Sequence, residues 1–322
     1  MDKPYVLGVD IGGTNTVFGV VDARGEIIDS GKISTGNYET AEAYLAVLAP
    51  ELITIIEKTG GKEKFNGIGI GAPNGNYYAG TIEDAPNVRW AKEKTIPFAK
   101  MVEYATGVTT ILTNDANAAA IGEMTYGVAK GMKNFIMITL GTGVGSGIVI
   151  NGQVVYGHDG FAGELGHVIV KKEDGRLCGC GRKGCLEAYA SATGVARTAR
   201  KFVEEGKIKT ILTEYPNVDN LTSKDVYDAA VKGDKVAIDI FRYTGQILGE
   251  AFADFIAFSS PEAIILFGGL AKAGKFIFDP IQEAMLEHSL GIFKGKTRLL
   301  LSELPEGDAA VLGASALGWE IK

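Results

Sequence analysis

The three cysteines of this 322-residue chain lie together in the stretch CGCGRKGC, with His167 not far before them. Three thiolates with C-x-C-x₄-C spacing and one imidazole form a Cys₃His set that suits tetrahedral Zn²⁺. Because four protein ligands leave no position for an activated water, we predict a structural zinc held by His167, Cys178, Cys180 and Cys185. The alternatives are reduced cysteines in a loop or a partial disulfide.

Two glutamates flank this stretch, Glu164 in GELGH and Glu187 in CLE. A folded zinc loop would bring both carboxylates near the ring of His167. Such a group can hydrogen-bond several vicinal hydroxyls, which is what a sugar presents, and zinc on one ring nitrogen would orient the other toward the sugar. The alternatives are a helix first-turn acid for Glu187 and a solvated turn for Glu164.

A strand, a glycine-rich turn and a second strand occur twice, as YVLGVDIGGTNTVFGVVD and as FIMITLGTGVGSGIVINGQVVY. Glycine turns let backbone N–H groups approach phosphate oxygens, and Asp10, beside the first turn, could hold Mg²⁺ through water. Either turn alone could be a tight hairpin with a local Asp–backbone bond. The repeat favours nucleotide binding by two related halves whose turns face one another.

Asp115 lies in TNDANAAAIGEM, at the junction of a strand and an Ala-rich helix. Asn114 and Asp115 are both suitable N-caps. Phosphoryl transfer to an alcohol, however, needs a carboxylate that positions the attacking hydroxyl and accepts its proton. Given the phosphate turns and the polyol cluster, we predict that Asp115 has this role.

Two other segments partly match phosphate-binding motifs. GIFKGKT, residues 291–297, has three residues between its glycines where a Walker A loop has four, and it leads into a strand-like run. GIGIGA, residues 67–72, lies within a predicted strand and is followed by Pro73, so it lacks the helix N-terminus of a dinucleotide site. We expect a basic surface turn at 291–297 and an ordinary strand at 67–72.

The element pattern is α/β, with antiparallel hairpins feeding parallel strands. Predicted strands are Tyr5–Asp10, Thr16–Asp22, Glu26–Ser34, Asn66–Gly71, Thr109–Thr113, Phe135–Leu140, Gly147–Ile150 and Ala263–Phe267. Predicted helices are 39–58, 96–106, 116–126, 187–205, 223–258 (one helix or a pair), 272–288 and one from Ala309 onward. Pro50 is expected to kink or divide the first helix.

Composition favours a small-molecule partner. The chain is 46% apolar and 22% charged with a net charge of -7, so nonspecific binding to nucleic acid or an anionic membrane is not expected. No run approaches the roughly 18 apolar residues of a membrane span, and MDKPYVLGVD does not read as a signal peptide. We therefore expect a cytoplasmic protein.

Seven motifs, in this order and spacing, resemble the ROK family, whose sugar kinases include bacterial glucokinases: DIGGT, APN (85–87), NDAN, GTGVGSG, GELGH, CGCGRKGCLE and FGG (267–269). The resemblance implies a two-lobed actin-like ATPase (ribonuclease H-like) fold with a cleft between the lobes. One lobe would comprise 1–114 and 309–322, and the other 115–308, with the zinc loop, sugar site and nucleotide-binding elements. It also implies ATP and Mg²⁺, and a homodimer.

The resemblance further implies roles for individual residues. Asp115 would be the general base toward the sugar 6-hydroxyl. The implied sugar ligands are Asn87, Asn114, Asp115, Glu164, His167 and Glu187. The implied neighbours of the ATP phosphates are Asp10, Gly12, Gly13, Thr14, Thr142 and Gly143, with Gly268 and Gly269 near the nucleoside. His167 and the three cysteines would bind zinc.

The expected activity is ATP-dependent phosphorylation of a hexose at the 6-hydroxyl, with glucose as the main candidate. Asn74 and Asn76 in GAPNGNYY depart from the glycine and acid of the family's glucokinases, so an N-acetylhexosamine or another hexose is the alternative substrate. A sugar-responsive repressor, the other class in this family, is less expected because few residues precede Tyr5 and the chain is acidic.

Overall fold

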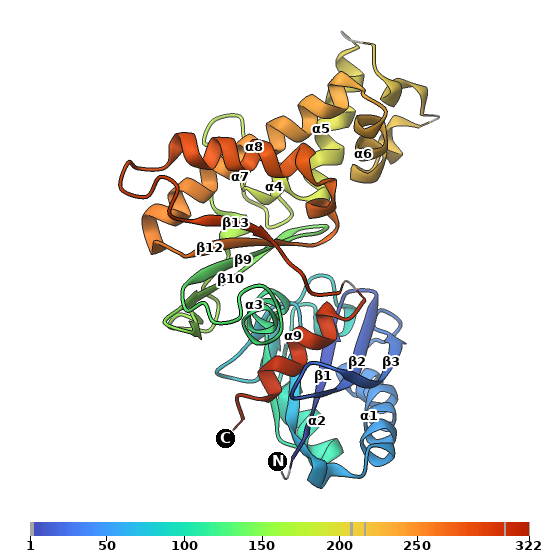
Figure 1. Cartoon of the computed structure of the whole chain (residues 1–322). Helices are drawn as coiled ribbons and strands as arrows, with labels where there is room; N and C mark the ends of the chain where they lie inside the picture. Colours follow the sequence, from blue (N-terminus) through green and yellow to red (C-terminus); the bar gives the residue numbers. More distant parts are fainter. Residues whose placement is uncertain (1–2, 207–208, 216, 306, 322) are drawn as a thin grey trace. The chain divides into compact units, whose positions relative to one another are not determined.

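The computed structural model describes residues 3–206, 209–215, 217–305 and 307–321 (Figure 1). The chain divides into two compact units. Unit 1 comprises Met1–Lys133, Gly147–Gly163 and Ser302–Lys322, and unit 2 comprises Asn134–Ser146 and Glu164–Leu301.

Unit 1 is built on a sheet with the strand order β3-β2-β1-β4-β8. Its strands are β1 (Tyr5–Ile11), β2 (Asn15–Asp22), β3 (Ile27–Ser34), β4 (Phe65–Gly71) and β8 (Thr110–Thr113). The first three pair antiparallel, and β4 and β8 continue from β1 in parallel. This confirms the predicted meander that feeds parallel strands. GIGIGA begins within β4, as expected.

The second sheet repeats this order as β11-β10-β9-β12-β13. Its strands are β9 (Phe135–Leu140), β10 (Val144–Ile150), β11 (Gln153–Val154), β12 (Ala263–Phe267) and β13 (Arg298–Leu301). Strand β12 runs parallel to β9 and β13, and all three belong to unit 2. The equivalent order of the two sheets confirms the repeat predicted from the glycine-turn motifs.

The two faces of the unit 1 sheet carry different helices, which are α1 (Ala41–Lys58), α2 (Phe98–Thr106), α3 (Asp115–Thr125) and α9 (Ala309–Gly318). Because side chains alternate along a strand, Leu7 and Val9 join the core shared with α1 and α2, whereas Val6 packs with α9. Gly8 and Gly69 allow α9 to lie directly on β1 and β4, since a Cβ at Gly69 would collide with the carbonyl of Ala314. The core on this second face of the sheet therefore includes residues of α9.

Unit 2 covers β9, β12 and β13 with helices, namely α4 (Glu187–Ala190), α5 (Ala192–Glu205), α6 (Ser223–Val231), α7 (Lys235–Ser259) and α8 (Lys275–His288). Helices α7 and α8 lie side by side (Figure 1), because Gly245 and Gly249 of α7 leave room for the backbone of α8. The predicted span 223–258 corresponds to the two helices α6 and α7, which is one of the two predicted possibilities.

Several boundaries differ from the prediction. Pro50 does not divide α1, which begins after an N-cap at Thr40, whose Oγ1 accepts a hydrogen bond from the N–H of Ala43 at 3.2 Å. The predicted helix 187–205 is two helices, because Ser191 is extended and caps α5. Helix α8 begins at Lys275, after a 3₁₀ turn over 269–273.

The structure also has short elements that were not predicted. A small sheet contains β5 (Gly75–Asn76), β6 (Thr81–Glu83) and β7 (Thr95–Ile96). The 3₁₀ helices are η1 (Lys62–Lys64), η2 (Arg89–Ala91), η3 (Leu165–His167), η4 (Ile211–Glu214), η5 (Val218–Asn220) and η6 (Gly269–Ala273). GIFKGKT forms the expected surface turn before β13.

The compact units differ from the predicted lobes, because 115–133, 147–163 and 302–308 lie in unit 1. Helix α3 packs against α9 and β4, which accounts for its place there. The ends of the predicted first lobe, 1–2 and 322, lie outside the described residues, and the lobe boundaries stay a prediction. Within the described part of the chain, no helix has both the length and the hydropathy needed to cross a bilayer.

Candidate functional site

Two acidic residues meet at one edge of the unit 1 sheet. In the parallel register Asp10 of β1 pairs with Gly71 of β4, and Gly71 pairs with Thr113 of β8. Asp115 follows Thr113 closely in the chain. A Cβ at Gly71 would lie 3.3 Å from Asp10 Oδ1 and 3.7 Å from the Cα of Asp115. Asp10 and Asp115 therefore flank Gly71, where the carboxyl ends of the three strands meet.

The N-terminus of α3 combines a cap with an exposed carboxylate. Asn114 is the N-cap, and its Oδ1 accepts a hydrogen bond from the N–H of Asn117 at 2.6 Å. Asp115 is the first helical residue, and its Oδ1 accepts from the N–H of Ala116 at 2.9 Å. The Asp115 side chain is exposed. Capping is thus the work of Asn114, which leaves Asp115 available to a ligand.

The pKa values of both carboxyls are raised. Burial, and then the charge of Asp115, raise the pKa of Asp10 to about 7. Desolvation by the surrounding protein also raises the pKa of Asp115, and it outweighs the backbone hydrogen bonds that lower this pKa. Solvent nevertheless reaches the Asp115 side chain. A raised pKa makes a carboxylate a stronger proton acceptor, so Asp115 is suited to take a proton from a hydroxyl.

The first glycine turn joins β1 to β2 beside Asp10. The N–H of Gly12 donates to the carbonyl of Asn15 at 3.0 Å, and the carbonyl of Thr14 accepts from the N–H of Thr35 at 2.9 Å. A Cβ at Gly13 would lie 3.0 Å from the carbonyl oxygen of Asn87. The predicted site residues of unit 1 thus lie on segments that contact one another at this edge. They are Asp10, Gly12, Gly13, Thr14, Asn87, Asn114 and Asp115.

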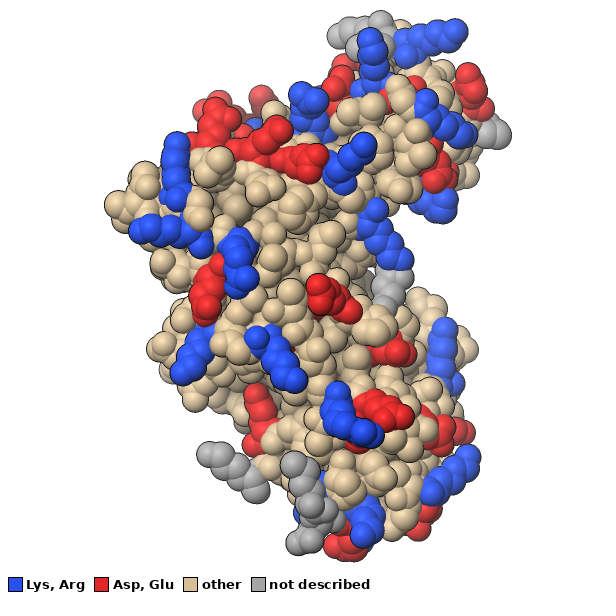
Figure 2. Space-filling view, in the orientation of Figure 1, with Lys and Arg blue, Asp and Glu red and all other residues tan. Residues whose placement is uncertain are grey.

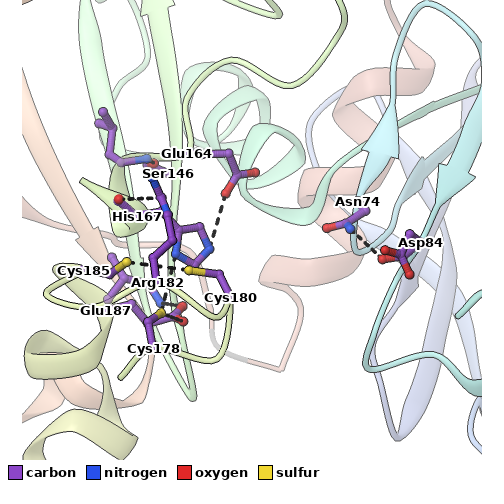
Figure 3. A network of polar contacts seen from close by, with 12 residues as sticks. Asn74, Asp84, Ser146, Glu164, His167, Cys178, Cys180, Arg182, Cys185 and Glu187 are labelled. Carbon is purple, nitrogen blue, oxygen red and sulfur yellow. Dashed lines mark hydrogen bonds and ion pairs between the residues drawn. The ribbon is translucent and has the colours of Figure 1, made fainter. Parts of the chain in front are cut away.

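In unit 2 the four predicted zinc ligands converge (Figure 3). The ligand atoms of His167, Cys178, Cys180 and Cys185 all lie within 4.8 Å of one another, and the cysteines form no disulfide. The Sγ atoms of Cys180 and Cys185 are 3.6 Å apart, and Cys178 Sγ is 3.7 Å from His167 Nδ1. Two sulfurs bound tetrahedrally at about 2.3 Å would be about 3.8 Å apart, so the set fits Zn²⁺.

The two ring nitrogens of His167 face different partners. Nδ1 faces the thiols, and Nε2 lies 4.0 Å from Glu164 Oε2. A guanidinium nitrogen of Arg182, in the cysteine loop, donates to the carbonyl of His167 at 2.8 Å (Figure 3). Sequence reasoning missed Arg182, because basic residues are frequent in exposed loops.

Glu187 connects the cysteine loop to the second glycine turn. Its Oε1 lies 3.5 Å from Cys178 Sγ, and Glu187 Oε2 accepts a hydrogen bond from the N–H of Val144 at 3.0 Å. A Cβ at Gly143 would lie 2.5 Å from Glu187 Oε2, so this glycine makes room for the carboxylate. Glu187 is also the first residue of α4, the predicted alternative.

A cavity of about 510 Å³ opens beside this turn within unit 2. It is lined by Gly141, Thr142, Ala192, Ser223, Lys224, Tyr227, Phe241, Gly269, Leu270, Lys272 and Ala273. It therefore brings together Thr142 and Gly269 from the predicted nucleotide residues. Gly268, at φ 102°, packs against the carbonyl of Leu140. Sequence reasoning missed Tyr227 and Phe241, whose helical spacing is that of ordinary core residues.

Charged residues of both signs are interspersed on the face drawn in Figure 2, in each unit. On that face, the described Lys and Arg residues form no contiguous basic stripe of the kind that follows a nucleic-acid backbone. The absence of a nucleic-acid partner stays a prediction.

Comparison with known proteins gives one family. The sequence matches the ROK family over residues 6–320. A glucokinase from Halalkalibacterium halodurans is 36% identical, over 100% of this chain and 96% of that protein. The crystal structure of a ROK family glucokinase from Streptomyces griseus in complex with glucose and AMPPNP is similar with a TM-score of 0.80 and 34% identity, over 98% of this chain and 99% of that one.

The crystal structure of a ROK family transcriptional regulator, a homolog of the E. coli MLC protein, has a TM-score of 0.85 and 26% identity, over 98% of this chain and 78% of that one. Together with the glucokinase structure, this likeness confirms the two-lobed actin-like ATPase fold. With matches along nearly its whole length, the chain belongs to the ROK family.

Proposed function

We propose that this protein is a hexose kinase that transfers the γ-phosphoryl group of ATP to the 6-hydroxyl of glucose. The glucokinase relatives, aligned over almost their full length, support this activity. The observation that carries the proposal is the β register that brings Asp10 and Asp115 together across Gly71, beside a glycine turn. A phosphoryl transferase needs both an acceptor for the hydroxyl proton and a carboxylate near the phosphates.

Asp115 would orient the attacking hydroxyl and receive its proton as the bond to phosphorus forms. Its exposed carboxyl and raised pKa favour this role. Asp10 would hold Mg²⁺ through water, which would neutralise charge on the phosphates. The backbone of Gly12, Gly13 and Thr14 would contact phosphate oxygens.

In unit 2, Thr142 and Gly143 would approach the phosphates and Gly268 and Gly269 the nucleoside. The 510 Å³ cavity supports this part of the proposal, because Thr142 and Gly269 both line it. It is also large enough for a nucleoside by the usual size of ligand sites.

The sugar would be bound by Glu164, His167 and Glu187 in unit 2 and by Asn87 and Asn114 in unit 1. Zinc on Nδ1 of His167 would fix the ring so that Nε2 can donate to a sugar hydroxyl. The distances of 3.6 and 3.7 Å among the four ligands support a structural zinc. The proposal also includes two lobes, one of residues 1–114 and 309–322 and the other of residues 115–308. The protein would be a cytoplasmic homodimer that binds neither nucleic acid nor a membrane.

The test is a coupled ADP-release assay with Mg·ATP and glucose, mannose, fructose, N-acetylglucosamine or N-acetylmannosamine, with Asp115→Asn alongside. Turnover that is highest on glucose and lost in the variant supports the proposal. Highest turnover on an N-acetylhexosamine would replace glucose with the alternative substrate class. Sugar binding without turnover, in folded zinc-loaded protein, would favour a regulator, the class of one structural relative.

A further inference from the structure

Asn74 lies in a tight turn with an unusual backbone conformation. Its φ is 50°, in the left-handed region that glycine and asparagine tolerate best. The turn is closed by a hydrogen bond from the N–H of Gly75 to the carbonyl of Ala72 at 3.1 Å. The carbonyl of Asn74 accepts from the N–H of Glu83 at 3.1 Å, so the conformation is held from both sides.

This turn packs directly on the segment that carries the proposed catalytic residue. The N–H of Ala72 donates to the carbonyl of Thr113 at 3.0 Å, and a Cβ at Gly75 would collide with that same carbonyl. Asn114 and Asp115 follow Thr113 immediately. Asn74 therefore lies next to the N-terminus of α3, and its side chain is exposed.

The amide of Asn74 is oriented by the loop that carries Asn87. Its Nδ2 donates to the carbonyl of Asp84 at 2.9 Å (Figure 3). Because the two ends of an amide point apart, this bond turns Oδ1 away from the loop. Within the described residues Oδ1 has no hydrogen-bond partner, so it is an exposed acceptor with a fixed direction, on a turn that contacts both proposed sugar-binding segments of unit 1.

Asn76, the other departure from the glucokinase pattern, differs in this respect. It is 6% exposed, its Nδ2 donates to the carbonyl of Asp159 at 2.8 Å, and its Oδ1 accepts from the N–H groups of Tyr78 and Ala79. Its amide is thus used within the protein. Of the two asparagines, Asn74 is the one that can reach a ligand.

We propose that Asn74 Oδ1 accepts a hydrogen bond from one ring hydroxyl of the bound sugar, other than the 6-hydroxyl, and so helps to select the hexose. This inference rests on the proposed sugar kinase function. An acceptor at a fixed position discriminates between epimers, because it loses its partner when that hydroxyl is missing or inverted. Asn74 is then a substrate-binding residue that glycine at the same position cannot replace.

The test is Asn74→Gly, which keeps the backbone conformation and removes the amide. Glucose affinity by calorimetry and KM and kcat by ADP release are measured with glucose and its 1-, 2-, 3- and 4-deoxy analogues. Loss of one neutral hydrogen bond predicts about five- to tenfold weaker binding and higher KM for glucose, with kcat little changed. For the analogue that lacks the contacted hydroxyl, variant and wild type should not differ.

Asn151→Gly is the matched control, because Asn151 also has a positive φ, 54°, but lies in the turn between β10 and β11. It should leave all affinities unchanged. The role of Asn74 would be overturned if Asn74→Gly weakened the binding of glucose and of every analogue equally. It would also be overturned if the variant weakened the binding of none of them. Failure of the kinase function looks different, since wild-type protein would then turn over no sugar. Calorimetry would still test Asn74, and wild type that binds no sugar would refute both.

Discussion

Asp10 and Asp115 flank Gly71 at the carboxyl edge of the unit 1 sheet, and the charge of Asp115 adds to burial in raising the pKa of Asp10 to about 7. Two like charges in one place are costly for the folded protein without ligands. A site for Mg²⁺ and phosphates has this property, because the bound cation offsets the repulsion. In the proposed site, the same two carboxyls would therefore lower the stability of the ligand-free protein and favour binding of the cation.

Asp10→Asn should stabilise the ligand-free protein at alkaline pH. Because the folded-state pKa of about 7 lies above the ordinary 3.8, the folded chain holds an extra proton between these values. Wild-type stability therefore falls as pH rises through this window and stays low above it. We expect the variant to be more stable by roughly 1 to 3 kcal/mol at pH 8, but nearly equal at pH 4.

Urea unfolding in chelator at both pH values measures this difference. The control is Asp239→Asn, which makes the same substitution at an exposed position of α7 in unit 2 and should change the free energy of unfolding by less than about 0.5 kcal/mol. A stability gain for Asp10→Asn that is equal at the two pH values would contradict the argument.

The pH profile of kcat/KM should report the state of Asp115. The carboxylate must be ionised to accept the hydroxyl proton, and surrounding protein raises its pKa above 3.8. We expect the rate to fall at acidic pH, with an apparent pKa that belongs to the Asp10–Asp115 pair. A profile that stays flat down to about pH 4.5 would show that no carboxyl with a raised pKa limits the reaction.

Cys180→Ser should weaken both zinc and sugar binding. Loss of one thiolate opens the tetrahedral set, and His167 then loses its orientation toward Glu164. We expect reduced zinc content, a lower Tm and about tenfold weaker glucose binding, because His167 would no longer be oriented by the metal. Lys183→Ala, exposed in the same loop, is the control. Unchanged zinc content and glucose affinity in Cys180→Ser would refute the role of the metal.

Gly69→Ala should destabilise unit 1 by about 2 to 4 kcal/mol, because the added methyl group would force α9 away from β4. Chemical unfolding measures the loss. Gly291→Ala adds the same methyl group where nothing lies within 4 Å, and its free energy of unfolding should change by less than about 0.5 kcal/mol. Equal stability of the two variants would mean that α9 adjusts without cost.

Local chemistry made part of this structure predictable. The cluster of His167 with the three cysteines followed from the cysteine spacing, and a cap at Asn114 or Asp115 from their place before an Ala-rich helix. Strands of two or three residues, such as β5 and β7, have no periodicity to detect. The meeting of Asp10 with Asp115 depends on the register of parallel strands far apart in sequence, and the cavity residues Tyr227 and Phe241 on how separate helices pack.

Unit 1 is assembled from three separate stretches of chain, and the last of them supplies α9. Gly8 and Gly69 leave the sheet bare where α9 sits. During synthesis on the ribosome, the part of this face that α9 covers therefore stays bare until α9 has emerged. A nascent chain that stalls before Ala309 would present this apolar surface to chaperones.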